Sequence, residues 1–142
     1  MPLAENRRFL SIDYGERRIG LAKSDPSGTI ASALITIEVS SMVEAVKKIA
    51  EKIGEIEPDG IVIGYPLLMS GDKSEKCLVI DKFAEKLAEI YDRPIHKVDE
   101  RWSSTEAADI IHAHGKKTGQ DKGRIDRLAA VIILQRFLDG ES

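Results

Sequence analysis

The sequence has little cysteine, few aromatic side chains and no long apolar run. Its 142 residues include one cysteine, Cys77, so no disulfide can form within the chain, and a lone thiol suits a reducing compartment. The longest apolar run, Leu128 to Leu134, is far shorter than the roughly 20 residues that span a bilayer. Residues 1–6 lack the apolar segment of a secretion signal. We therefore expect a cytoplasmic protein with no membrane partner.

A strong charge of one sign is also missing. The 24 acidic residues exceed the 21 Lys and Arg residues by three, for a net charge of −3. This balance excludes a uniformly basic nucleic-acid coat protein, but it leaves room for a local basic face. A hydrophobic share of 42% and a charged share of 32% exclude a disordered or collagen-like chain. The length predicts a single domain, residues 1–142.

Hydrophobic periodicity predicts an α/β fold. Short apolar runs predict strands over residues 8–13, 18–24 and 29–38, joined as an antiparallel meander. Two further strands, 61–63 and 94–98, alternate with helices that begin at capping boxes such as Ser41 with Glu44. The helices are expected over residues 42–56, 74–91, 103–112 and 124–139, with a loop over 114–123. In the second helix the residues expected to point inward are Leu78, Val79, Phe83, Leu87 and Ile90. The order implies one mixed sheet with helices on its faces.

Acidic residues stand at the ends of these predicted elements. Asp13 ends the first strand, Asp99 and Glu100 end the last strand, and Asp126 is expected in the first turn of the final helix. A buried carboxylate without a partner is costly, and three around one point repel each other unless a cation lies among them. Mg²⁺ suits such oxygen ligands, and two ions about 4 Å apart can clamp a phosphodiester.

Each acid also has a structural explanation. Asp13 could begin the turn that follows its strand, and Glu100 could pair with Arg101. Asp126 by itself resembles an acid favoured near a helix N-terminus by the helix dipole. Spacing alone does not choose between these roles and a metal site.

Five motifs in order carry a family resemblance across residues 8–139. They are Asp13-Tyr14-Gly15, Arg18-Ile19-Gly20-Leu21-Ala22, Gly64-Tyr65-Pro66-Leu67 with Gly71, Asp99-Glu100-Arg101 with Ser104-Thr105 and Ala107, and Asp126 with Ala129-Ala130 and Ile133-Leu134-Gln135. They resemble the YqgF (RuvX) family, described as Holliday junction resolvases or pre-16S rRNA nucleases. The resemblance implies a ribonuclease H-like mixed five-stranded sheet with helices on both faces. It also implies Asp13, Glu100 and Asp126 as catalytic ligands of two Mg²⁺ or Mn²⁺ ions.

The fourth strand departs from the wider superfamily. Many ribonuclease H-like nucleases place an acid on this strand, whereas here it ends Ile63-Gly64-Tyr65-Pro66. The second carboxylate must then come from the fifth strand, as Asp99 or Glu100. Because successive strand residues point to opposite faces, only one of the two can face Asp13. We choose Glu100 for its longer side chain and expect Asp99 to play a supporting role.

Basic residues near these acids predict a nucleic-acid partner. Their loops would place a positive rim around the carboxylates; they are Arg17, Arg18, Arg101, Lys116, Lys117, Lys122 and Arg124. The resemblance implies a metal-dependent nuclease acting on structured nucleic acid. We rank RNA, as processing of the 5′ end of pre-16S rRNA in ribosome biogenesis, above branched DNA, as resolution of a Holliday junction. Either a monomer or a weak homodimer fits these substrates.

Two other classes of function compete with a nuclease. The first is a non-catalytic nucleic-acid-binding or transcription-regulatory module with the same fold. The second is a phosphotransferase, because Asp13-Tyr14-Gly15 before a hairpin resembles the first phosphate loop of actin and sugar kinases. Those enzymes enclose ATP between two such domains, and 142 residues supply one.

Overall fold

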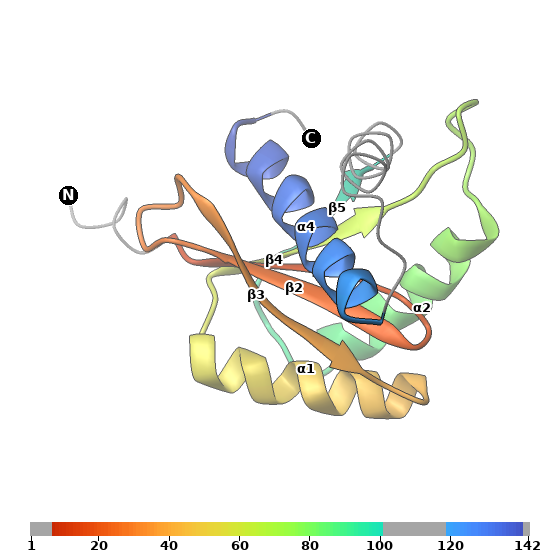
Figure 1. Cartoon of the computed structure of the whole chain (residues 1–142), viewed down its shortest axis with the longest axis horizontal. Helices are drawn as coiled ribbons and strands as arrows, with labels where there is room; N and C mark the ends of the chain where they lie inside the picture. The colour runs from red at the N-terminus through yellow and green to blue at the C-terminus, as the bar shows by residue number, and fades with distance from the viewer. Residues whose placement is uncertain (1–6, 101–118, 141–142) are drawn as a thin grey trace.

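The computed structural model describes residues 7–100 and 119–140. The predicted helix 103–112 lies outside these residues. The strands are β1 (Phe9–Asp13), β2 (Arg18–Ser24), β3 (Ala31–Glu38), β4 (Gly60–Tyr65) and β5 (Ile95–Asp99). The helices are α1 (Met42–Ile56), α2 (Glu75–Ala88) and α4 (Gly119–Leu138) (Figure 1). The predicted alternation of strands and helices is confirmed for the described residues.

The strands form one mixed sheet in the order β3-β2-β1-β4-β5. Strands β1, β2 and β3 are antiparallel neighbours, with Asp13 opposite Gly20. Strands β1, β4 and β5 run parallel, with Ile12 beside Ile63 and Gly64 beside Val98. The carboxyl ends of these three parallel strands therefore meet at one edge of the sheet.

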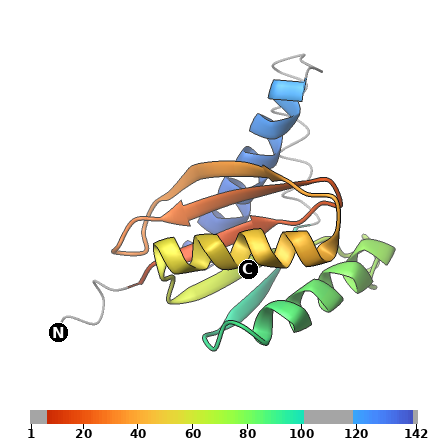
Figure 2. The same ribbon diagram turned by 90° about the horizontal axis from the view of Figure 1, so that it is seen from below.

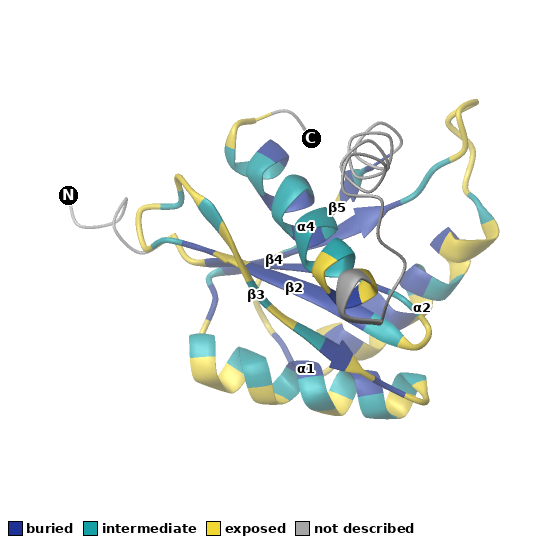
Figure 3. Ribbon diagram, in the orientation of Figure 1, coloured by how far each residue is buried: buried dark blue, intermediate teal, exposed yellow. Residues whose placement is uncertain are grey.

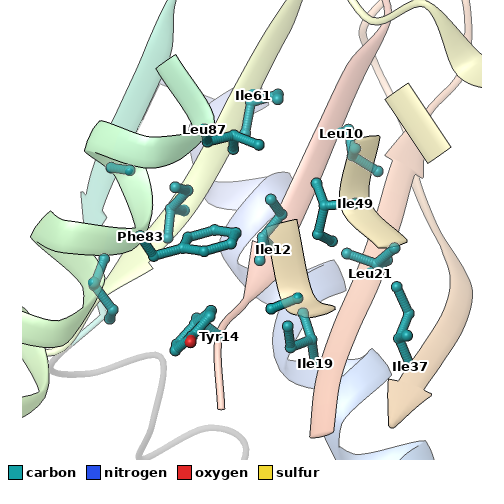
Figure 4. Packing of buried hydrophobic residues seen from close by; sticks show 14 of the residues in the cluster. Leu10, Ile12, Tyr14, Ile19, Leu21, Ile37, Ile49, Ile61, Phe83 and Leu87 are labelled. Carbon is teal, nitrogen blue, oxygen red and sulfur yellow. The ribbon is translucent and has the colours of Figure 1, made fainter. Parts of the chain in front are cut away.

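Helices cover both faces of the sheet, as predicted. Helices α1 and α2 lie on one face and α4 lies on the other (Figures 1 and 2). The larger core lies under α1 and α2, where Leu10 and Ile12 of β1 meet Ile49, Phe83 and Leu87 (Figure 4). A smaller core lies under α4 and consists of Phe9, Ala22, Val62, Val98, Ala130, Ile133 and Leu134. The central strands are buried from both sides (Figure 3).

The buried face of α2 differs from its prediction. Phe83 and Leu87 are buried as expected, but Leu78 is 61% exposed and Ile90 is 51% exposed. The Ser74 hydroxyl caps the helix and accepts a hydrogen bond from the backbone N–H of Cys77. The buried stripe then runs through Cys77, Ile80, Phe83, Ala84 and Leu87. This stripe has regular three- and four-residue spacing, so the helix buries the small Cys77 and leaves the adjacent leucine in solvent.

Helix α4 begins at Gly119, five residues earlier than predicted. The prediction of a loop over 114–123 is therefore wrong for residues 119–123. Glycines disfavour helix by about 1 kcal/mol each, but packing on the sheet compensates: the Thr36 hydroxyl donates a 2.6 Å hydrogen bond to the Gly123 carbonyl. Asp126 consequently lies seven residues into the helix rather than in its first turn.

Close contact between α4 and β2 depends on Gly20. A Cβ at this position would lie 2.1 Å from the backbone oxygen of Asp126. We expect Gly20→Ala to push the helix off the sheet and to lower the free energy of unfolding by about 2 kcal/mol, a fall in Tm of about 4–8 °C. Gly54→Ala is the matched control, because nothing lies within 4 Å of its Cβ and alanine favours helix there. Thermal melts in which Gly20→Ala is as stable as wild type would contradict this packing.

Candidate active site

Strand alternation places four important residues on the face of the sheet that α4 covers. In β1, Leu10 and Ile12 enter the core under α1 and α2, whereas the Ser11 hydroxyl donates a 2.7 Å hydrogen bond to the Ala130 carbonyl of α4. Asp13 shares the face of Ser11, since strand side chains alternate with a period of two. The same alternation brings Gly20, Gly64 and Glu100 to this face, which gathers them around the carboxyl end of β1.

Glu100 lies over the glycine of the neighbouring strand. Its backbone N–H donates to the Tyr65 carbonyl at 3.2 Å, which continues the β4–β5 pairing past Asp99. A Cβ on Gly64 would lie 3.0 Å from both Cδ and Oε1 of Glu100. The Glu100 carboxyl therefore fills the space above the fourth strand that the missing acid leaves. Glu100 as a whole is only 6% exposed.

The carboxyls of Asp13 and Glu100 hold their protons unusually tightly. The pKa of Asp13 is raised to about 6, mainly by burial; the charge of Lys76 lowers it, and the charge of Asp126 raises it. Burial raises the pKa of Glu100 to about 7; the charge of Asp13 adds to this shift, and Lys76 opposes it. Such strongly shifted acids are typical of functional sites. The mutual effects show that Asp13 interacts electrostatically with both other predicted acids.

Asp126 is oriented by an arginine. Arg18 Nε donates to Asp126 Oδ2 at 2.8 Å, and both side chains are partly buried. Among the residues that the structure describes, no group of three or more His, Cys, Asp or Glu side chains is arranged to hold a metal ion as it stands. Asp13 and Glu100 thus interact electrostatically as a pair, and Asp126 is held in an ion pair with Arg18.

Lys76 is a site residue that the sequence analysis missed. It is exposed on the first turn of α2, and its charge lowers the pKa of both Asp13 and Glu100. A signal was available, because a lysine in the first turn opposes the helix dipole and is unfavourable there. The charge of Lys76 interacts unfavourably with the N-terminal end of the α2 dipole. A lysine at such a position therefore indicates a role outside the helix.

A polar cluster on the opposite face fixes the strand ends beneath the site. The Tyr65 hydroxyl donates to Asp81 Oδ1 at 2.9 Å. Lys97 Nζ and Lys73 Nζ donate to the same carboxylate at 2.7 Å and 3.0 Å. The cluster ties β4, β5 and α2 together directly before Glu100.

Two hollows lie near the β1–β2 connection, and basic residues line them or lie on α4. A hollow of about 830 Å³ is lined by Arg17 and Arg18 on one side and by residues 39–42 on the other, with Glu16 and Glu38 also in its wall. A second hollow of about 430 Å³ lies between residues 14–16 and residues 75–79, which include Lys76. Lys122 and Arg124 are exposed on α4. The predicted binding residues Arg101, Lys116 and Lys117 lie outside the described residues.

The donor set fits a hard divalent cation. Within the described part of the chain, neither Asp13 nor Glu100 accepts a hydrogen bond at its carboxyl, unlike Asp25 and Asp81, which do. Carboxylate oxygens are the ligands that Mg²⁺ and Mn²⁺ prefer. A cation between Asp13 and Glu100 would relieve their repulsion and would favour their charged forms.

The fold is ribonuclease H-like. The chain superposes on the RuvC structure of Thermus thermophilus with a TM-score of 0.59, covering 94% of this chain and 95% of that one at 12% identity. It superposes on the fowlpox virus Holliday junction resolvase with a TM-score of 0.55, covering 94% and 99% at 11% identity. These likenesses show that the chain has the same fold as these two resolvases.

The chain belongs to the RuvX family, described as Holliday junction resolvase, whose model matches residues 7–140. A Roseiflexus protein (strain RS-1) named "Putative pre-16S rRNA nuclease" is 38% identical over 97% of this chain and 98% of its own length. A protein of the same name from Crocosphaera subtropica is 39% identical over 92% of this chain and 91% of its own. The resemblance in the five motifs is thereby confirmed. In the part of the chain that the structure describes, no helix has the length and apolarity to cross a membrane.

Proposed function

We propose that this protein is a divalent-metal-dependent nuclease that hydrolyses phosphodiester bonds in structured nucleic acid. The observation that carries the proposal is the pair of carboxyls of half-buried Asp13 and buried Glu100, at the carboxyl ends of β1 and β5, the two parallel strands on either side of β4. Their pKa values are raised, no described donor satisfies them, and a third acid stands beside them. The relatives named as nucleases support the same reaction.

The three acids and Lys76 have different roles in the proposed reaction. Asp13 interacts electrostatically with both other acids, and the three carboxylates of Asp13, Glu100 and Asp126 would together hold the ions. Two bound Mg²⁺ or Mn²⁺ ions would supply an activated water and stabilise the leaving oxygen. The products expected of this hydrolysis carry a 5′-phosphate and a 3′-hydroxyl. Lys76, exposed at the rim, is placed to offset negative charge on the bound phosphate.

The substrate we propose first is RNA at the 5′ end of pre-16S rRNA. The names of the curated relatives support this ranking, and the family description supports a four-way DNA junction as the second substrate. Arg18, paired with Asp126, and its neighbour Arg17, with Lys122 and Arg124 on α4, would supply cations for a phosphate backbone despite the net charge of −3. Such a local field is sufficient for binding.

Cleavage of three labelled substrates side by side tests this proposal. The substrates are an RNA that carries the 5′ leader of 16S rRNA, a single-stranded RNA of equal length, and a four-way DNA junction, each with Mn²⁺ or with EDTA. We expect metal-dependent cleavage of the leader RNA above both others. Binding to all three without cleavage of any would contradict the nuclease and favour a non-catalytic module. Preferential cleavage of the junction would reverse the ranking of substrates.

A further inference from the structure

The Arg18–Asp126 ion pair joins the two sides of the site. Arg18 is the first residue of β2, and Asp126 lies on α4. The pair is 2.8 Å long, with side-chain exposures of 37% and 18%. It occupies the carboxylate that the proposed metal site needs, and the inference drawn here rests on that proposed function.

Helix α4 does not depend on this pair for its place on the sheet. The Thr36 hydroxyl of β3 donates to the Gly123 carbonyl at 2.6 Å, and Arg127 Nη1 donates to the same hydroxyl at 3.1 Å. The backbone of α4 also lies directly on Gly20. Because these contacts hold the helix, the effect of Arg18 falls mainly on the Asp126 side chain.

We propose that Arg18 is a resident cation that holds the Asp126 carboxylate in the metal-free protein and exchanges it for a nucleic-acid phosphate when a divalent cation is bound. Arg18 lines the 830 Å³ hollow together with Arg17, so the released guanidinium has open space next to it. A guanidinium can form bidentate ion pairs with a carboxylate or with a phosphate. The pair therefore competes with metal binding, and nucleic acid removes the competitor.

Two consequences follow for the affinity of the metal. Removing the Arg18 charge removes a competitor for Asp126, so Mn²⁺ should bind about fivefold more tightly to the free protein. In wild type, a bound nucleic acid should strengthen Mn²⁺ binding, and Mn²⁺ should strengthen nucleic-acid binding by the same factor. This reciprocal effect should shrink when Arg18 is absent.

Mn²⁺ binding, measured from the electron paramagnetic resonance signal of the unbound ion, tests the exchange without any cleavage. Arg18→Gln and Arg18→Met, which keeps the aliphatic stem, should both bind Mn²⁺ about fivefold more tightly than wild type. Arg17→Gln is the matched control: it removes the same charge from the neighbouring residue, for which the described residues provide no ion pair. It should stay within about twofold of wild type. Asp126→Asn should bind Mn²⁺ more weakly than wild type. The double variant Asp126→Asn with Arg18→Gln should bind Mn²⁺ no more tightly than Asp126→Asn alone.

Unchanged or weaker Mn²⁺ binding in both Arg18 variants would overturn the exchange, and so would an equal gain in Arg17→Gln. Either of these results would leave the proposed nuclease intact, provided that wild type binds Mn²⁺ and Asp13→Asn does not. If wild type binds no Mn²⁺ with or without RNA, the proposed metal site fails, and the exchange fails with it.

Discussion

Replacing Asp13 with asparagine is expected to slow phosphodiester cleavage by about a thousandfold or more. Asparagine keeps the size of the side chain but removes the negative charge that interacts with the other two acids. The stabilisation that metal ions give such a reaction amounts to several kcal/mol, and each 1.4 kcal/mol is a factor of ten in rate. In EDTA, affinity for nucleic acid should stay nearly unchanged, because we expect basic side chains rather than Asp13 to contact the phosphates. Single-turnover cleavage and fluorescence anisotropy measure the two effects separately.

Asp92→Asn is the matched control for this change. Asp92 is exposed in the turn before β5, at the opposite end of the strand from Glu100. The same substitution there should leave both cleavage and binding as in wild type. Full activity of Asp13→Asn would remove the metal-nuclease proposal, and loss of activity in both variants would indicate a general effect of charge.

The metal-free protein is expected to lose stability as the pH rises from about 4 to 7. The pKa of Asp13 is raised from 3.8 to about 6, and that of Glu100 from 4.5 to about 7. Within this range the folded protein binds more protons than the unfolded chain, so the free energy of unfolding falls with rising pH. A shift of about two units corresponds to about 3 kcal/mol, which we expect for the coupled pair as a whole. Urea unfolding at a series of pH values in EDTA measures this loss.

Below about pH 4 the dependence reverses. Hydrogen bonds from the backbone of Ile30 and other donors lower the pKa of Asp25 to about 2, and Lys97 does the same for Asp81. These groups add stability above their unfolded pKa values, and this stability is lost as the pH falls toward 2. The metal-free protein should therefore be most stable near pH 4, and a steady rise in stability from pH 4 to 7 would contradict the buried pair.

Glu100→Gln tests how much the charge of Glu100 contributes to stability and to metal binding. At pH 7 in EDTA it should melt about 3–6 °C above wild type, because the buried charge is gone. Millimolar Mn²⁺ should stabilise wild type by about 3 kcal/mol if it exceeds its Kd a hundredfold, and should stabilise the variant far less. Glu51→Gln, an exposed change on α1, should match wild type in both conditions. Equal metal stabilisation of Glu100→Gln and wild type would show that Glu100 is no ligand.

Most of the fold was predictable because strand and helix periods differ clearly in this chain. The change from apolar runs to helical spacing after Ser41 marks the end of the meander and the start of the crossovers. The start of α4 was not predictable, since Gly119 and Gly123 lie in a polar segment and only the contact with Thr36 favours helix there. The exposure of Leu78 likewise follows from the register of α2 on the sheet, which apolarity alone does not fix.

The placement of the candidate acids could be predicted where it depended on single elements, whereas their role as metal ligands stays a prediction. The alternation of β5 and the choice of Glu100 over Asp99 agree with the position of the Glu100 carboxyl above Gly64. The ion pair of Arg18 with Asp126 was not predictable, because it joins residues 108 positions apart. Lys76 was missed for a similar reason: its effect on the acids depends on how α2 packs on the sheet. Properties of residue pairs from different elements therefore required the structure.

The most direct test of the proposed metal site is the anomalous diffraction signal of crystals soaked in Mn²⁺. We expect a peak between the carboxylates of Asp13 and Glu100, with oxygens about 2.1 Å from the ion. We also expect the Asp126 carboxylate to turn away from Arg18 and toward this ion. Soaks of Asp13→Asn crystals should show no such peak. Wild-type crystals with full Mn²⁺ occupancy elsewhere and none between these two carboxylates would contradict the account.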